Sequence, residues 1–356
     1  MTITGTTPET TAMPAGPPPP AIALQLASGF IASQAVYVFT KLGMADALAG
    51  GPRPAEVVAT RLGTSPDQTR RLLRTLAGFG VVDEVATETY QLTQVGELFR
   101  NEPGSLADLT TMWMETHYIP FAGMTGTVAD GRSAFQALEG EDYWSWLQHN
   151  EGTAELFSRA MGSFGAQTQT AAVAAFDFSP YERIVDVGGA HGSFLASALA
   201  SSDTSRGVLY DLPHVVDTAG PFLQGVEVDH RVECIGGDFF ESVPADGDAY
   251  LLSLILHDWD DADCVRILST IRQAIPSHGV LLVLENVIPD GNEPHLGKVI
   301  DMIMMTILNG TERTRAEYSV LLREAGFSID EVVATQAPTS LIVARPSATS
   351  SPRDTR

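Results

Sequence analysis

The first region of the chain, residues 21–104, has the hydrophobic pattern of a winged helix. Amphipathic helices are expected at 54–63 and 65–78, followed by two short alternating strands between residues 81 and 92. Each helix has a proline in or just before its first turn, where the missing N–H costs nothing. Ser65 and the glutamine three residues later also predict a capping box for the second helix.

Two further regions follow. Residues 105–178 predict helices rich in aromatic side chains and methionine, which are common in cores but also suit a pocket for flat ligands. Residues 179–346 alternate apolar strands with helices. The expected strands are 183–187, 207–210, 231–235, 248–256, 279–284 and 340–343, and the expected helices are 191–200, 261–275 and 314–325. This alternation predicts an α/β fold with a doubly wound, mostly parallel sheet.

The two ends of the chain, residues 1–20 and 347–356, are predicted to be a disordered lead and tail. Residues 21–40 carry no charge, but polar residues and glycine interrupt them, so they make a poor membrane-spanning helix. The lead has no Lys or Arg and therefore lacks the positive start of a signal peptide. We expect a helix covered on nearly all sides by protein, in part by a second copy of the chain.

The charge balance excludes several kinds of partner. The chain has 21 basic and 44 acidic residues, a net charge of −23, which disfavours nucleic acid and anionic membranes. Residues 51–100 are balanced in charge, so we favour dimerisation over DNA binding for the winged helix. Cys234 and Cys264 are too few for a disulfide framework or a four-cysteine zinc site, and they fit a cytoplasmic protein.

Residues able to bind a ligand stand just after the predicted strands, where ligands bind in such sheets. The residues after the first three strands are Asp186, Gly188 and Gly189, then Asp211, then Asp238 with Phe239. The glycine spacing does not match the dinucleotide fingerprint and instead favours a tight turn around a ligand with a carboxylate and an amine. Asp211 could bind ribose hydroxyls, and Asp238 with Phe239 could contact an adenine. Each could also be an ordinary turn residue.

His257 follows the fourth strand and is the candidate general base. With an ordinary pKa near 6.5, it could accept a proton from an acidic hydroxyl, or it could merely satisfy local hydrogen bonds. Glu285 and Glu312 could orient the ring and favour the imidazolium, or could be ordinary loop acids. Helix capping explains Asp258 and the acids after it, so no metal is expected.

Together these residues resemble the S-adenosylmethionine-dependent O-methyltransferases of the caffeate and isoflavone type, whose bacterial members modify aromatic secondary metabolites. The resemblance covers about residues 21–346. Its most specific segments are 186–192, 210–214, 236–240, 256–261 and 309–314. It implies S-adenosylmethionine as cofactor, S-adenosylhomocysteine as product, a small aromatic substrate, and a homodimer formed through the winged-helix region.

The resemblance also implies a role for each site residue. The cofactor would be held by Asp186, Gly188, Gly189, Asp211, Leu212, Asp238, Phe239 and Ser253. His257 would be the base, oriented by Glu285 and Glu312. The substrate would contact Phe157, Met161, Asp258, Met302 and Met305.

Three departures from the family pattern affect these expectations. Ala190 replaces a third glycine of the turn, and Ser253 replaces a lysine that contacts the cofactor in plant members. Residues 301–303 lack an asparagine that some bacterial members use for the substrate. The competing hypotheses are a related enzyme that uses the cofactor for hydroxylation or decarboxylation, a DNA-binding regulator with a small-molecule sensor domain, and more distantly a nicotinamide dehydrogenase.

Overall fold

The computed structural model describes residues 17–347, and the chain divides into two compact units, Met1–Asn101 and Glu102–Arg356. Most of the predicted disordered lead and tail lies outside the described residues. Where the lead is described it differs from the prediction, because the first helix already begins at Pro19. A proline fits this position because the first turn of a helix does not use the N–H group that proline lacks.

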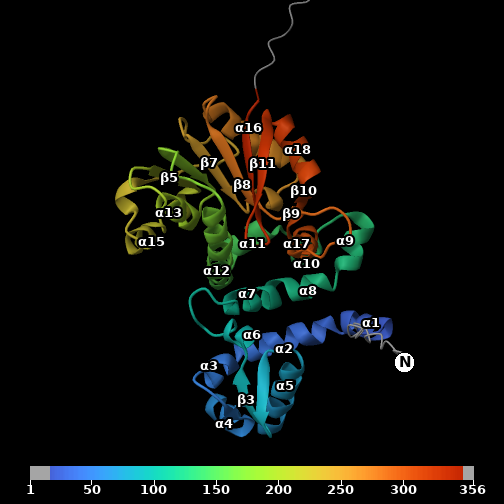
Figure 1. Ribbon diagram of the computed structural model, residues 1–356. Coiled ribbons are helices and arrows are strands. Elements are labelled where there is room, and N and C mark those ends of the chain that lie inside the picture. Colours follow the sequence, from blue (N-terminus) through green and yellow to red (C-terminus); the bar gives the residue numbers. More distant parts are fainter. Residues whose placement is uncertain (1–16, 348–356) are drawn as a thin grey trace, which may run out of the picture. The chain divides into compact units, whose positions relative to one another are not determined.

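The first unit contains helices followed by a three-stranded sheet (Figure 1). Its elements are α1 (Pro19–Ala27), α2 (Gly29–Lys41), α3 (Met44–Leu48), β1 (Arg53–Pro54), α4 (Ala55–Leu62), α5 (Pro66–Gly78), β2 (Val82–Ala86), β3 (Thr89–Leu92) and α6 (Gln94–Glu97). Leu73 and Leu76 of α5 pack against Tyr90 of β3 in the core. The side chain of Ser65 makes no capping hydrogen bond, so the predicted capping box is wrong although the helix is present.

The uncharged stretch at the start of this unit is not one buried helix, which corrects the prediction. It forms α1 and α2, which meet at Ser28 with a bend of 51°. Leu24, Leu26 and Phe30 are 70%, 78% and 57% exposed in the single chain. Of the helices that the structure describes, none is by itself long and apolar enough to span a membrane. Helices α1 and α2 have the required length and apolar character only when they are taken together as one bent segment.

The second unit is built on a seven-stranded sheet in the order β11-β12-β8-β7-β4-β5-β6. Its strands are β4 (Arg183–Val187), β5 (Arg206–Asp211), β6 (Val232–Gly236), β7 (Ala249–Ser253), β8 (Val280–Glu285), β11 (Phe327–Ala334) and β12 (Ser340–Pro346). The five strands from β8 to β6 are parallel, and β12 and β11 are antiparallel additions at one edge. The predicted α/β fold with a mostly parallel sheet is confirmed.

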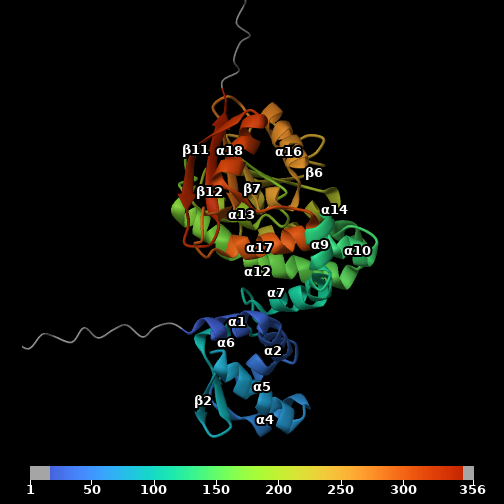
Figure 2. The ribbon, with the colours of Figure 1, turned by 90° about the vertical axis from the view of Figure 1, so that its right-hand side faces the viewer.

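Alternate residues of the strands fill two cores, one on each face of the sheet. Val185 and Val187 of β4 pack with α16 (Asp261–Ala274) and α18 (Arg315–Glu324). Ile184 faces the opposite core, which contains Phe194 of α13 (Ser193–Leu199). Figures 1 and 2 show these helices beside the strands. The capping box predicted for Thr314 is present at the start of α18.

Helices α7 to α11 and α17 gather at one end of the sheet, whereas α15 lies beside α13 (Figure 1). The elements outside the main sheet are α7 (Ala107–Met112), α8 (Tyr118–Phe121), α9 (Met124–Asp130), α10 (Ala134–Glu139), α11 (Tyr143–His149), α12 (Glu151–Ala175), α14 (Pro213–Val216), α15 (Gly220–Gly225), β9 (Val287–Ile288), α17 (Leu296–Ile303) and β10 (Arg313–Thr314). A π-helical turn, Trp113–His117, follows α7, and another, Met304–Leu308, follows α17. Because a π turn holds an extra residue, it changes which side chains share a helix face.

Candidate active site

A cavity of about 410 Å³ lies within the second unit, at the ends of β4, β5 and β7. It contains most of the predicted site residues. Those that line it are Asp186, Gly188, Gly189, Asp211, Ser253, Phe157, Met161, His257 and Asp258. Apolar and aromatic side chains make up most of the remaining wall, among them Trp113, Tyr143, Trp144 and Met304. The cavity therefore suits a largely apolar ligand with a few fixed polar contacts.

The glycine turn after β4 brings backbone to the edge of this cavity. Gly188 has a φ of +70°, and Ala190 has a φ of +50° where glycine would be less strained. A Cβ on Gly189 would lie 2.6 Å from Oδ2 of Asp186, so this position must lack a side chain. The amide of Ala190 donates to Oδ2 of Asp211 at 2.9 Å, which ties the turn to the end of β5.

Asp186 is a buried carboxyl at the end of β4, with only 1% of its surface exposed. Neither of its oxygens has a hydrogen-bond partner among the described residues, and burial raises the pKa of Asp186 to about 7. Burial also raises the pKa of Asp211, although the amides of Ala190 and Leu212 stabilise its charge. Two carboxyls beside a glycine turn fit a cofactor with donor groups, such as the amine and ribose of S-adenosylmethionine.

His257 stands in a short 3₁₀ turn, Leu256–Asp258, just beyond β7. The predicted strand over 248–256 is too long, because β7 ends at Ser253 and Leu254 adopts a φ of +55°. This break in the backbone turns the chain out of the sheet and lets the following residues wrap around a buried acid. Oε1 of Glu285, at the end of β8, accepts hydrogen bonds from the amides of Ile255 and Leu256 at 3.1 and 2.8 Å.

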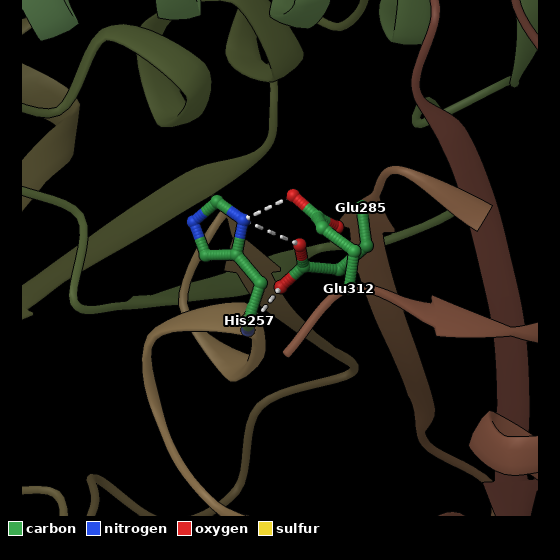
Figure 3. A group of neighbouring side chains, drawn as sticks. All are labelled: His257, Glu285 and Glu312. Atoms are coloured by element: carbon green, nitrogen blue, oxygen red, sulfur yellow. Dashed lines mark hydrogen bonds and ion pairs between the residues drawn. The ribbon is translucent and has the colours of Figure 1, made fainter. Parts of the chain in front are cut away.

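Two glutamates face the same nitrogen of the His257 imidazole (Figure 3). Its Nδ1 lies 2.9 Å from Oε1 of Glu312 and 3.6 Å from Oε2 of Glu285. Asn286 donates to the same Oε1 of Glu312 at 2.8 Å. The other ring nitrogen, Nε2, points away from the glutamates and lies 3.4 Å from Oδ1 of Asp258. The predicted trio of one imidazole and two carboxylates is therefore assembled beside the cavity.

The electrostatics of this trio differ from the sequence prediction. Burial alone would lower the pKa of His257, but the negative charges of Glu285, Asp258 and Glu312 outweigh it and raise the pKa to about 10. Burial raises the pKa of Glu285 and brings that of Asp258 to about 6. The expected ordinary pKa near 6.5 is thus wrong, because the surrounding carboxylates favour the protonated ring.

Three residues of the segment 309–314 support His257 in roles that were not predicted. The guanidinium of Arg313 is 2% exposed and donates to the carbonyl of Leu256 at 2.9 Å and to Asp261 at 2.7 Å. The amide of Thr311 donates to the carbonyl of His257 at 2.8 Å. A Cβ on Gly310 would collide with that same carbonyl. The motif marks these residues but not their contacts, because their partners are 50 or more positions away in the sequence.

Five predicted contact residues do not line the cavity. Leu212 is 42% exposed, and Asp238 accepts from the amide of Phe240 in its own turn. Phe239 lies behind the glycine turn, 3.6 Å from the position of a Cβ on Gly188. Met302 and Met305 are not among the lining residues, whereas their neighbours Ile303 and Met304 are.

A metal ion would find three possible ligand atoms in the trio. One atom from each of His257, Glu285 and Glu312 lies within 4.8 Å of the others. These atoms already bond to one another, to backbone amides and to Asn286, which accounts for their positions without an ion.

The fold and this site define an S-adenosylmethionine-dependent methyltransferase. Residues 121–328 match the family model of the O-methyltransferase domain, and residues 24–102 match that of the O-methyltransferase dimerisation domain. The chain belongs to the O-methyltransferase family, and S-adenosylmethionine is its cofactor. The family resemblance predicted from the sequence is confirmed.

Relatives match over most of the chain. Phenazine O-methyltransferase PhzM of Lysobacter antibioticus is 38% identical over 326 residues, covering 91% of this chain and 96% of the relative. The 3-amino-4-hydroxybenzoate 4-O-methyltransferase of Streptomyces cremeus is 37% identical, covering 90% and 88%. The solved structure of the mitomycin 7-O-methyltransferase MmcR has a TM-score of 0.84 at 31% identity, covering 92% and 98%. These matches do not favour the regulator, dehydrogenase or non-methylating alternatives.

Proposed function

We propose that this O-methyltransferase transfers a methyl group to a hydroxyl on a small aromatic acceptor, with His257 as the general base. The position of His257 carries the proposal, because its ring stands in the wall of an apolar cavity with Nδ1 fixed by Glu312 and Nε2 left for a ligand. Similarity to a phenazine O-methyltransferase and to a 3-amino-4-hydroxybenzoate 4-O-methyltransferase supports an aromatic acceptor.

The cofactor supplies an activated methyl group on a cationic sulfonium, and transfer to oxygen leaves S-adenosylhomocysteine and releases one proton. The protein's tasks are to align the acceptor and to hold that proton. A phenol has a pKa near 10, so little phenolate exists in water at neutral pH. The neutral imidazole of His257 would accept the acceptor's proton at Nε2, which gives an imidazolium–phenolate pair with Nε2–H beside the acceptor oxygen. Its raised pKa makes the imidazolium the stable form during transfer.

The polar residues around the glycine turn fit the cofactor. Asp186 has two buried oxygens without partners and would accept from the cofactor's amine. Asp211 would accept from the ribose hydroxyls while it continues to hold the amide of Ala190. Ser253 lines the same part of the cavity. The adenine would lie toward Phe239, behind the turn. No step in this scheme needs a metal.

The assembly proposed is a homodimer formed through the first unit. The match of residues 24–102 to the dimerisation domain supports it, as does the exposed apolar surface of α1 and α2. Leu24, Leu26 and Phe30 would be covered by the second copy. Burying apolar area of this kind is the main driving force of association between subunits.

The test is a methyl-transfer assay with a panel of phenols, read as S-adenosylhomocysteine formed. Wild-type protein should methylate at least one aromatic hydroxyl, and His257→Ala should lower kcat by about 10²–10⁴. Calorimetric titration should show that the variant binds the cofactor as wild type does, because His257 contacts the acceptor side. Unchanged turnover in His257→Ala would remove the base from the scheme.

A further inference from the structure

We propose that His117, Thr116 and Tyr143 form a polar subsite in the cavity wall that recognises an uncharged hydroxyl or amine on the acceptor ring and rejects a carboxylate. This inference rests on the proposed function and narrows its acceptor class. The subsite is separate from the trio around His257 and from the glycine turn.

The three residues form one buried cluster. Thr116 and His117 end the π turn after α7, and Tyr143 begins α11. Their exposed fractions are 5%, 7% and 2%, and His117 and Tyr143 both line the cavity. The two rings meet edge to face with their centroids 5.6 Å apart. A polar cluster this deeply buried in an aromatic wall needs hydrogen-bond partners to offset its desolvation.

The hydrogen bonds of Thr116 fix the tautomer of His117. The Thr116 hydroxyl donates to the carbonyl of Met112 at 2.8 Å and lies 2.7 Å from Nδ1 of His117. A hydroxyl has one proton and the Met112 carbonyl can only accept, so Nδ1 must be the donor to Thr116. Burial lowers the pKa of His117 to about 4, which keeps the ring neutral. Nε2 is then a hydrogen-bond acceptor.

Tyr143 adds a second polar group. Its hydroxyl is buried and makes no hydrogen bond of good geometry among the described residues, although the side chain of Thr116 is near enough to lower its pKa. Burial outweighs that effect and raises the pKa of Tyr143 to about 12, so the hydroxyl stays neutral and able to donate. An acceptor nitrogen on His117 beside a hydroxyl on Tyr143 matches a ligand group that both donates and accepts. A ring hydroxyl or amine has this chemistry, whereas a methyl group satisfies neither atom.

The charges around the cavity oppose a carboxylate at this subsite. No Lys or Arg is among the residues that line the cavity, whereas Asp186, Asp211 and Asp258 are. The imidazolium of His257 is committed to the reacting oxygen in the proposed function. A carboxylate beside His117 and Tyr143 would therefore be buried without a counter-charge, which is strongly unfavourable.

The experiment compares hydroxynaphthalenes that share the reacting hydroxyl and differ at one other ring position. That position carries a hydroxyl, amine, methyl, methoxy or carboxylate group, and kcat/KM is measured at saturating cofactor. Wild-type protein should prefer the hydroxyl or amine over methyl by about tenfold or more, the usual effect of leaving buried polar groups unpaired. The carboxylate should be the poorest of the series.

Three variants and a control separate the contributions. His117→Phe should lower kcat/KM for the hydroxyl and amine compounds more than for the methyl compound, and so remove the preference. Tyr143→Phe deletes one oxygen and should reduce the preference with little risk to folding. Thr116→Val removes the partner of Nδ1, so the ring can adopt the tautomer with Nε2–H. The kcat/KM of the methoxy compound, whose oxygen can only accept, should then rise relative to that of the hydroxyl compound. His149→Phe, an exposed histidine on α11, should change nothing.

The outcomes distinguish this subsite from the proposed function. Absence of methyl transfer to every phenol would refute the proposed function. Transfer to the whole series at equal kcat/KM would overturn the subsite alone. The subsite is also overturned if the carboxylate compound is the best substrate, or if His117→Phe and Tyr143→Phe both keep the wild-type preference.

Discussion

Replacing Asp186 with asparagine should stabilise the ligand-free protein, and the gain should depend on pH. The carboxyl is buried without partners, and its pKa is raised from 3.8 to about 7. As the pH rises above 4, the unfolded chain ionises at this position while the folded chain stays protonated. Wild-type stability should therefore fall between pH 4 and pH 7 relative to the variant, because the unfolded state releases the proton first.

The size of this effect follows from the pKa change. One pH unit corresponds to 1.36 kcal/mol, so the rise from 3.8 to about 7 amounts to about 4 kcal/mol. Asp186→Asn should approach wild-type stability near pH 4 and exceed it by up to about 4 kcal/mol at pH 8. Asparagine keeps the shape and polarity of the neutral acid, which makes it the appropriate substitution.

Urea unfolding followed by tryptophan fluorescence provides the assay. All four tryptophans, at positions 113, 144, 146 and 259, belong to the second unit, so the signal reports on the unit that contains Asp186. Asp217→Asn, at an exposed carboxyl, serves as the control and should show no such trend. A difference between Asp186→Asn and wild type that does not change from pH 4 to pH 8 would refute the reasoning.

Three other predictions concern the site and the assembly. Wild-type kcat/KM should rise with pH and level off near the pKa of His257. Glu285→Gln removes a charge 3.6 Å from Nδ1 and should lower the pH at which kcat/KM levels off by about one to three units. An identical pH profile in the variant would contradict the assignment of His257 as the base. Asp211→Ala should weaken cofactor binding at least tenfold in a calorimetric titration, because it loses both the ribose contact and the bond to the glycine turn; equal affinity would exclude that role. Leu26→Lys should convert the dimer to a monomer in sedimentation velocity, and an unchanged mass would place the interface elsewhere.

Local patterns were enough to predict the central fold. The β4 strand has the predicted bounds, because three of its five residues are β-branched apolar residues that pack on the two faces of the sheet. The capping box at Thr314 was also correct. The edge strand β11 was missed because its apolar residues do not alternate regularly with polar ones. Seven of its eight residues are also exposed or partly exposed. Exposed edge strands lack the pattern that identifies buried ones.

The residues of the candidate site could be predicted from the sequence, but their pKa values and long-range contacts could not. Strand ends placed His257, Asp186 and Asp211 at one cavity, as expected for a parallel sheet. The raised pKa of His257 could not be read from the sequence, because it depends on distances to carboxylates far along the chain. The same holds for Arg313, whose partners are brought close only by folding.

The two π turns make helix register a determinant of acceptor choice. Deleting one residue from Met304–Leu308 would turn the side chains that follow the deletion within this last turn by about 100° around the helix axis, and so change which of them face the cavity. The same applies to Trp113–His117 on the other wall. Engineers seeking a new acceptor range could thus use single-residue deletions and insertions here, a change that point substitutions do not reproduce.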